Sequence, residues 1–243
     1  TRNAAKAGEN TKTFNISTSD IPEVIIDQSR IIFYPTKDAF MAGTIYVPNP
    51  DSVGQNSANI GYKNTAKGQY AQAFGYQSTA RGNYSMAVGK NSLAASINSF
   101  AFGEDALANN DESYAFGRGA SAYGYRSFAF GSAGIDSSGN TTPITQAKGN
   151  YSFAIGQGSI TGLDFEECPE APNKFQGSQE EYWQQYYQGI GAIAIGVGDS
   201  AAANYSTAIG YYNTSDYGAV ALGYENKAKG FRSAISGGYK NNA

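Results

Sequence analysis

The stretch that decides the fold runs through Ala73-Phe74-Gly75, Ala87-Val88-Gly89, Ala101-Phe102-Gly103, Ala115-Phe116-Gly117 and Ala129-Phe130-Gly131. Each of these glycines follows the previous one by fourteen residues. The signature returns at Ala154-Ile155-Gly156, Ala194-Ile195-Gly196, Ala208-Ile209-Gly210 and Ala221-Leu222-Gly223, so that ten rungs are visible up to residue 237. Self-similarity at a short fixed period is typical of a solenoid, in which each repeat packs on its neighbours.

Each rung divides into two seven-residue halves of the form Gly-x-x-Ser-x-Ala-x, as in residues 75–81 and 82–88. Small and large residues alternate within each half, for example Ser99 and Ala101 against Phe100 and Phe102. Period two is typical of a β-strand. Glycine opens each half, and we expect it there because turns use positive φ angles. The sequence therefore predicts an all-β parallel solenoid with two short strands and two turns in each fourteen-residue rung.

A coil this thin leaves room only for serine and alanine between its two strands. The larger side chains must then point outward and form a continuous apolar wall along the chain. Soluble proteins seldom leave such a surface bare, so we expect it to be covered by further copies of the same chain. The predicted interface consists of Val88, Phe100, Phe102, Tyr114, Phe116, Phe128, Phe130, Phe153, Ile155, Ile193, Ile195, Ile209 and Leu222.

The repeated Ser-x-Ala-Ile/Phe/Val-Gly pattern resembles the head domain of trimeric autotransporter adhesins, the YadA-like left-handed parallel β-roll. The resemblance covers roughly residues 50–237. It implies a homotrimer with the bulky side of each roll at the shared axis. Self-association follows from the residues, whereas the number three comes from the resemblance. The chain departs from the pattern in its many phenylalanines, in two insertions, and in having no visible stalk or anchor.

The repeat divides the chain into two regions. Residues 1–46 lack the period and contain predicted strands at 13–17, 24–26, 30–34 and 44–47, the last of which ends in the roll. This region is either a cap over the first rung or a small separate β segment. Residues 47–243 form the predicted roll, with insertions at 132–146 and 163–188. The first insertion is a loop rich in Gly, Ser, Thr and Asp.

The second insertion begins with an acidic stretch that includes Asp164, Glu166, Glu167 and Glu170. We interpret this stretch as a solvated loop, because its spacing is not that of a calcium loop. Ser178-Gln179-Glu180-Glu181 has the form of a capping box and predicts a short helix through the aromatic residues that follow. Long surface insertions often carry function. The candidate ligand-binding residues are Trp183, Tyr182, Tyr186, Tyr187 and, in the first insertion, Asp136.

The composition argues against an enzyme. The 243 residues include no histidine, which removes Ser-His and Cys-His nucleophile pairs and imidazole metal ligands. We predict no catalytic residue, no metal site and no cofactor. A net charge of -3 argues against a surface for nucleic acid or an anionic membrane. The single cysteine, Cys168, provides no disulfide framework. Tyr62 with Tyr76, and Tyr211 with Tyr224, are expected to stack between rungs.

The resemblance implies a cell-surface adhesin head that attaches to host matrix or to neighbouring cells and contributes to virulence. Collagen-type matrix proteins are typical partners of related heads, and a cell-surface protein or glycan belongs to the same expectation. The chain would be extracellular, and would reach the outer membrane only through an anchor outside this chain. The alternative is a trimeric phage or phage-like tail fibre that binds a host receptor as part of a virion. A third hypothesis, an ice- or polysaccharide-binding solenoid, lacks a regular outward Thr-x-Thr row.

Overall fold

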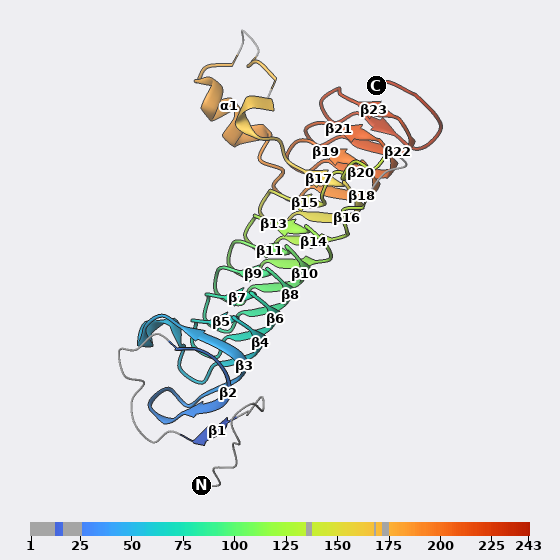
Figure 1. The fold of residues 1–243 in the computed structure, drawn as a ribbon. Helices are drawn as coiled ribbons and strands as arrows, with labels where there is room; N and C mark the ends of the chain where they lie inside the picture. The colour runs from blue at the N-terminus through green and yellow to red at the C-terminus, as the bar shows by residue number, and fades with distance from the viewer. Residues whose placement is uncertain (1–12, 17–25, 135–137, 168, 172–174) are drawn as a thin grey trace.

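Short strands stack above one another along an elongated rod, with the N-terminal strands at one end and the C-terminus at the other (Figure 1). The computed structural model describes residues 13–16, 26–134, 138–167, 169–171 and 175–243. The fold is an all-β parallel solenoid of about 13 turns with one short α-helix. The predicted fold class is therefore confirmed.

Two sheets, both parallel within the roll, run along the rod. The first has 14 strands in the order β1-β2-β3-β4-β6-β8-β10-β12-β14-β16-β18-β20-β22-β24. After the first three, its strands are β4 (Ala58–Tyr62), β6 (Gln72–Tyr76), β8 (Met86–Lys90), β10 (Phe100–Glu104), β12 (Tyr114–Phe116), β14 (Phe128–Phe130), β16 (Phe153–Gln157), β18 (Ile193–Val197), β20 (Thr207–Tyr211), β22 (Val220–Tyr224) and β24 (Ala234–Ile235).

The second sheet has 10 strands of two residues each, which lie opposite the longer ones. They are β5 (Thr65–Ala66), β7 (Thr79–Ala80), β9 (Leu93–Ala94), β11 (Leu107–Ala108), β13 (Ser121–Ala122), β15 (Gln146–Ala147), β17 (Ile160–Thr161), β19 (Ser200–Ala201), β21 (Thr214–Ser215) and β23 (Lys227–Ala228). Each coil of the roll thus contributes one strand to each sheet.

The strand register repeats the sequence period. Ala101 pairs with Ala87 on one side and with Ala115 on the other. These alanines are fully buried, and Ser99 beside them has no exposed surface either. Phe100 and Phe102, on the other face of the same strand, remain partly exposed. The expected division into a small inner face and a large outer face is confirmed.

The glycines of the two turns serve different purposes. Gly89 has a φ of 126°, as expected for a turn glycine. Gly82, which opens the other turn, does not have a positive φ. The prediction that glycine is needed there for a positive φ is therefore wrong at this position. A Cβ on Gly82 would overlap the backbone carbonyl of Ser96 in the next coil, which only glycine avoids. The positive φ of this turn belongs to Tyr84, at 57°.

An antiparallel pair begins the long-strand sheet. β2 (Ile26–Tyr34) and β3 (Ala39–Val47) flank the 3₁₀ turn η1 (Pro35–Lys37), and β1 (Thr13–Ile16) pairs with β2. β3 then pairs in parallel with β4, so that this pair continues into the roll through a second 3₁₀ turn, η2 (Pro50–Ser52). Met41, Ile45 and Val47 of β3 are buried. The antiparallel pair is therefore part of the same sheet as the long strands of the roll.

Two long connections interrupt the stack. The first joins β14 to β15, and Gln146, the last residue of the predicted insertion, already pairs with Ser121 of β13. The second joins β17 to β18 and contains the 3₁₀ turn η3 (Phe165–Glu167) and helix α1 (Gln179–Tyr186). In Figure 1, α1 is held out from the side of the rod. Among the described residues, no helix has the length and apolar character needed to cross a membrane.

Candidate functional site

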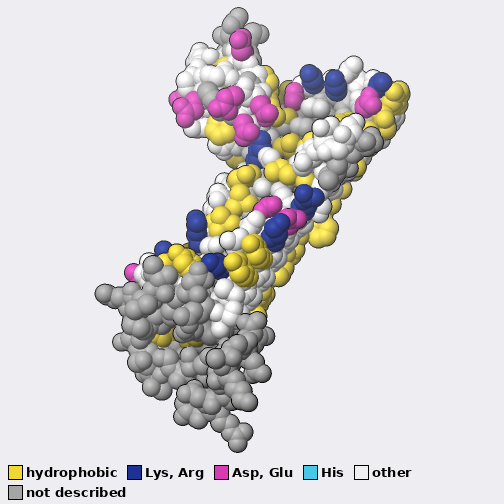
Figure 2. Space-filling view, viewed as in Figure 1, with side chains coloured by type: hydrophobic (Ala, Val, Ile, Leu, Met, Phe, Trp, Pro, Cys, Tyr) yellow, Lys and Arg dark blue, Asp and Glu magenta, His cyan; other side chains and the backbone are white. Residues whose placement is uncertain are grey.

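The first candidate surface is the apolar wall, defined as the thirteen predicted interface residues. None of them is buried within the single chain. Phe130 is 52% exposed, which is unusual for a phenylalanine in the middle of a sheet. Figure 2 shows hydrophobic side chains in a strip along one edge of the rod. The structure thus brings all the predicted interface residues onto outward-facing positions of the long-strand sheet.

Ring stacking orders the wall along the rod. Phe102 and Phe116 lie with their centroids 5.0 Å apart and their planes within 11°. Phe128 stacks on Phe153 at 4.9 Å, across the point where the first insertion leaves the roll. These spacings arise because equivalent residues of neighbouring strands are separated by about 4.8 Å. The wall is consequently continuous rather than a set of isolated exposed rings.

The predicted tyrosine ladders also form. Tyr62 stacks on Tyr76 with the centroids 4.8 Å apart, and Tyr211 stacks on Tyr224 at the same distance. The expectation of stacking is therefore confirmed for both pairs. Their side chains remain more than a third exposed on the surface of the rod.

The second candidate surface lies where α1 meets the roll. The predicted capping box is present: the Ser178 hydroxyl accepts a hydrogen bond from the backbone N–H of Glu181, and the Glu181 carboxylate accepts one from the N–H of Ser178. At the other end, Asn204 of the roll donates from its backbone N–H to the Tyr186 carbonyl and from its side chain to the Gln185 carbonyl. Helix C-termini leave such carbonyls without partners, so Asn204 fixes α1 to the roll.

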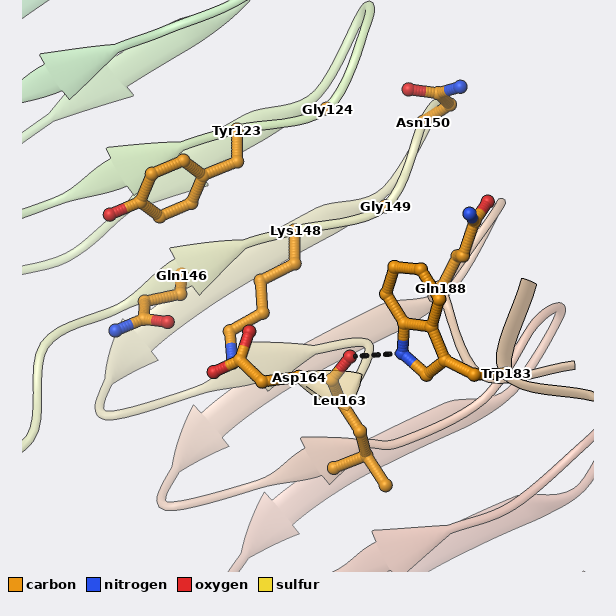
Figure 3. A pocket seen from close by; sticks show the side chains of 10 residues that line it. All are labelled: Tyr123, Gly124, Gln146, Lys148, Gly149, Asn150, Leu163, Asp164, Trp183 and Gln188. Atoms are coloured by element: carbon orange, nitrogen blue, oxygen red, sulfur yellow. Dashed lines mark hydrogen bonds and ion pairs between the residues drawn. The ribbon is translucent and has the colours of Figure 1, made fainter. Parts of the chain in front are cut away.

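A cavity of about 530 Å³ lies on one side of α1 (Figure 3). The indole N–H of Trp183 donates to the carbonyl oxygen of Leu163 at 2.9 Å. The ammonium group of Lys148 lies 2.8 Å from the Asp164 carboxylate, and the Lys148 side chain is only 15% exposed. Trp183 therefore ties the helix to the start of the insertion, while one edge of its ring lines the cavity.

The remaining ligand-binding candidates separate in the structure. Tyr182, Tyr186 and Tyr187 line a different cavity from the one that Trp183 lines. Asp136 lies outside the described residues, as does Cys168. The four aromatic candidates are therefore divided between two cavities that flank one helix.

The roll contributes residues to this second cavity that the sequence argument missed. They are Asp216, Tyr217, Lys229 and Phe231. Burial raises the pKa of the Asp216 carboxyl, and the nearby positive charge of Lys229 opposes that rise. One signal was available in the sequence, because the rung from Gly210 to Gly223 is a residue short immediately around Asp216.

Asp199 is a second residue that the sequence argument missed. It is fully buried, at a position where the following coil carries Asn213 and the preceding coil carries Ser159, and its Oδ2 atom has no hydrogen-bond partner. Its Oδ1 accepts from the backbone and side-chain nitrogens of Asn213, at 2.8 and 2.9 Å. Burial raises the pKa of this carboxyl. Its position inside the coil makes it a structural rather than a ligand-binding group.

The acidic part of the insertion is a solvent-facing surface. Asp164, Glu166, Glu167, Glu170, Glu180 and Glu181 are exposed, and Figure 2 shows these acidic side chains gathered around α1. No group of three or more His, Cys, Asp or Glu side chains placed to hold a metal ion occurs in the described part of the chain.

Comparison with known protein families matches the chain to the YadA head domain repeat (2 copies), over residues 66–92, 108–133, 144–159 and 188–213. These ranges fall on the regular coils of the roll and exclude most of both insertions. None of the curated proteins compared with the chain matches it. The repeats and the parallel solenoid together indicate an adhesin-like, surface-exposed protein of a type that is ordinarily non-enzymatic. The chain carries YadA head domain repeats and folds as expected of a YadA-like head.

Proposed function

We propose that this chain is the non-enzymatic head of a trimeric surface adhesin, which attaches its cell to host matrix or to neighbouring cells. The apolar wall is the observation that carries the proposal. It extends over most of the regular coils, and water contact along its whole length would be unfavourable by about 25 cal/mol for each Å² of apolar surface. Copies of the same chain offer the simplest matching surface, since the wall is the same on each.

Several features support an extracellular binding role over a catalytic one. The sequence contains no histidine, and the matched repeats belong to an adhesin family. The roll is stiff, because every coil bonds to the next through both sheets. Such a rod holds side chains of many coils at fixed spacing on its lateral surface. A partner with its own repeating structure, such as a matrix fibre, could therefore contact equivalent side chains on several coils.

The test uses purified chain at one concentration throughout. Sedimentation equilibrium is expected to give three times the chain mass of 25.7 kDa. The same sample is then applied to immobilised collagen-type matrix proteins and to cultured host cells. Saturable binding to either surface supports the proposal. A monomeric particle contradicts the trimeric part, and a trimer that binds neither surface contradicts the attachment role.

A further inference from the structure

The cavity between α1 and the last coils has a size and a lining suited to a small ligand. Its volume is about 400 Å³. Binding pockets for small molecules fall between about 300 and 1,000 Å³ and combine apolar walls with a few polar groups. Three segments contribute most of its lining: α1 provides Tyr182 and Tyr186, and the turns after β21 and β23 provide Tyr217 and Phe231.

Aromatic rings meet at a corner in this cavity. The rings of Tyr186 and Tyr217 lie 5.0 Å apart at an interplanar angle of 79°. Phe231 extends the roll side by stacking on Tyr217 at 5.2 Å, and 66% of its surface is exposed. Amphipathic rings of this kind can pack against the C–H groups of a ligand while the tyrosine hydroxyls stay available for hydrogen bonds. The corner therefore favours a rigid ligand with both C–H faces and hydroxyl groups.

Two charged groups of opposite sign complete the lining. The half-buried Asp216 carboxylate can accept hydrogen bonds and the Lys229 ammonium can donate them. In the described part of the chain, no side-chain hydrogen bond or ion pair occupies the Asp216 carboxylate. The pair adds no net charge to the cavity. A polyhydroxylated ligand could use both groups at once, because each of its hydroxyls donates and accepts.

Acidic side chains near the cavity disfavour ligands that carry a negative charge. The insertion that forms one side of the cavity carries six exposed carboxylates, of which Asp164 pairs with Lys148 and lines the other cavity. The remaining five are Glu166, Glu167, Glu170, Glu180 and Glu181. A field of this sign disfavours the approach of sialylated or sulfated sugars. A peptide is less well matched, because the lining supplies no free strand edge with which a peptide backbone could pair.

We propose that this cavity binds a neutral oligosaccharide, with sugar C–H faces in the aromatic corner and sugar hydroxyls on Asp216 and Lys229. The inference deepens the proposed adhesin function, on which it rests, by naming the class of receptor. The cavity lies at the turns that lead into β22 and β24, and does not include any residue of the apolar wall. The residues that would form the trimer interface are therefore different from the residues that would bind the sugar.

The test measures binding of the intact chain to immobilised neutral oligosaccharides built from galactose, glucose and N-acetylhexosamines, beside their sialylated counterparts and collagen-type peptides. We expect saturable binding to at least one neutral glycan and weaker binding to its sialylated form. Phe231→Ala and Asp216→Ala should each weaken that binding at least tenfold. Phe231 is well exposed, so its truncation leaves folding intact. Tyr84→Ala is the matched control, since Tyr84 is a 52% exposed turn residue far along the roll from the cavity.

The other results overturn the proposal. They are the absence of glycan binding, a preference for the sialylated form, binding that is unchanged in both cavity variants, and peptide binding that is lost in those variants. Adhesion of the same sample to cells is measured in parallel. Adhesion without glycan binding contradicts only the sugar site, whereas loss of all adhesion by the parent chain contradicts the proposed function.

Discussion

Asp199 stands where the next two coils toward the C-terminus place Asn213 and Asn226 inside the roll. Asn213, one coil further, donates from Nδ2 to the carbonyls of Ile209 and Gly223 at 3.1 and 2.8 Å. A carboxylate cannot make these bonds, because it has no proton to donate when ionised. The unpartnered Oδ2 atom of Asp199 is the result. One atom, Oδ2 in place of Nδ2, therefore decides whether this part of the side chain has a hydrogen bond.

We therefore predict that Asp199→Asn stabilises the fold at pH 7, by about 1–3 kcal/mol, since a buried polar atom gains a partner. The pKa of Asp199 is raised in the folded chain, so the folded chain binds the proton more tightly than the unfolded one. The parent loses stability as the pH rises from the ordinary carboxyl range toward the raised pKa, and regains it on acidification. The gain from Asp199→Asn should accordingly shrink near pH 4.

Thermal unfolding of both proteins at pH 7 and pH 4, at one protein concentration, measures this effect. Asp51→Asn serves as the control, because Asp51 is exposed and should alter neither midpoint. A gain of equal size at both pH values would show that ionisation of Asp199 is not the cause.

At the scale of the strand, the alternation of volumes sets what each sheet can do. β10 places Ala101 inside and Phe100 and Phe102 outside. β11 has the same alternation, with Ala108 inside and Leu107 outside, but on the opposite sheet. Only the long strands carry two large outward residues each, so that only their sheet builds a wall. The proposed oligomer should thus depend on one sheet and not on the other.

We predict that Phe102→Asp dissociates the proposed trimer into monomers at micromolar concentration. A charge buried without a partner at an interface costs several kcal/mol in each chain, and three chains would share one axis. Sedimentation velocity measures the mass of the particle. Leu107→Asp is the matched control, because it adds the same charge to the other sheet and should leave the mass unchanged. An unchanged mass for Phe102→Asp would contradict the role of the wall.

At the scale of the whole molecule, the insertions extend from the rod without breaking its period. A Cβ on Gly162 would touch the backbone of Gln188 and of Gly189, so the two ends of the second insertion lie side by side. β16 and β18 pair across it in full register, with Gly156 opposite Gly196. The stack therefore continues across the insertion without a change of register.

We predict that deleting residues 163–188 and joining Gly162 to Gly189 leaves the particle mass and the unfolding midpoint nearly unchanged. The deletion removes both cavities beside α1, so attachment to cells should fall. Deleting residues 133–143 provides the control, because it also restores a fourteen-residue rung but keeps α1. Attachment assays on the two deletion variants show which of the two insertions contributes to binding. Full attachment after deletion of residues 163–188 would show that α1 is not part of the binding surface.

The helix and the N-terminal strands show which elements could be predicted from short stretches of sequence. The capping box predicted α1, and the structure places the helix at Gln179–Tyr186, because its signal lies within a few residues of sequence. Of the strands predicted separately at 24–26 and 30–34, Ile26 and residues 30–34 belong to one strand, β2, while residues 24 and 25 lie outside the described residues. Pairing with β3 over nine residues extends this strand through residues whose sequence carries no clear alternation.

The sequence by itself determined the solenoid, its two sheets and the outward wall. A fourteen-residue coil admits only small side chains inside, so the alternation of serine and alanine with phenylalanine leaves one arrangement that packs. Only the tertiary structure decided that Tyr186 of the insertion meets Tyr217 of the roll and that Asp216 faces the same cavity. That meeting depends on where Asn204 holds the end of α1, and hydrogen bonds between distant segments leave no period in the sequence.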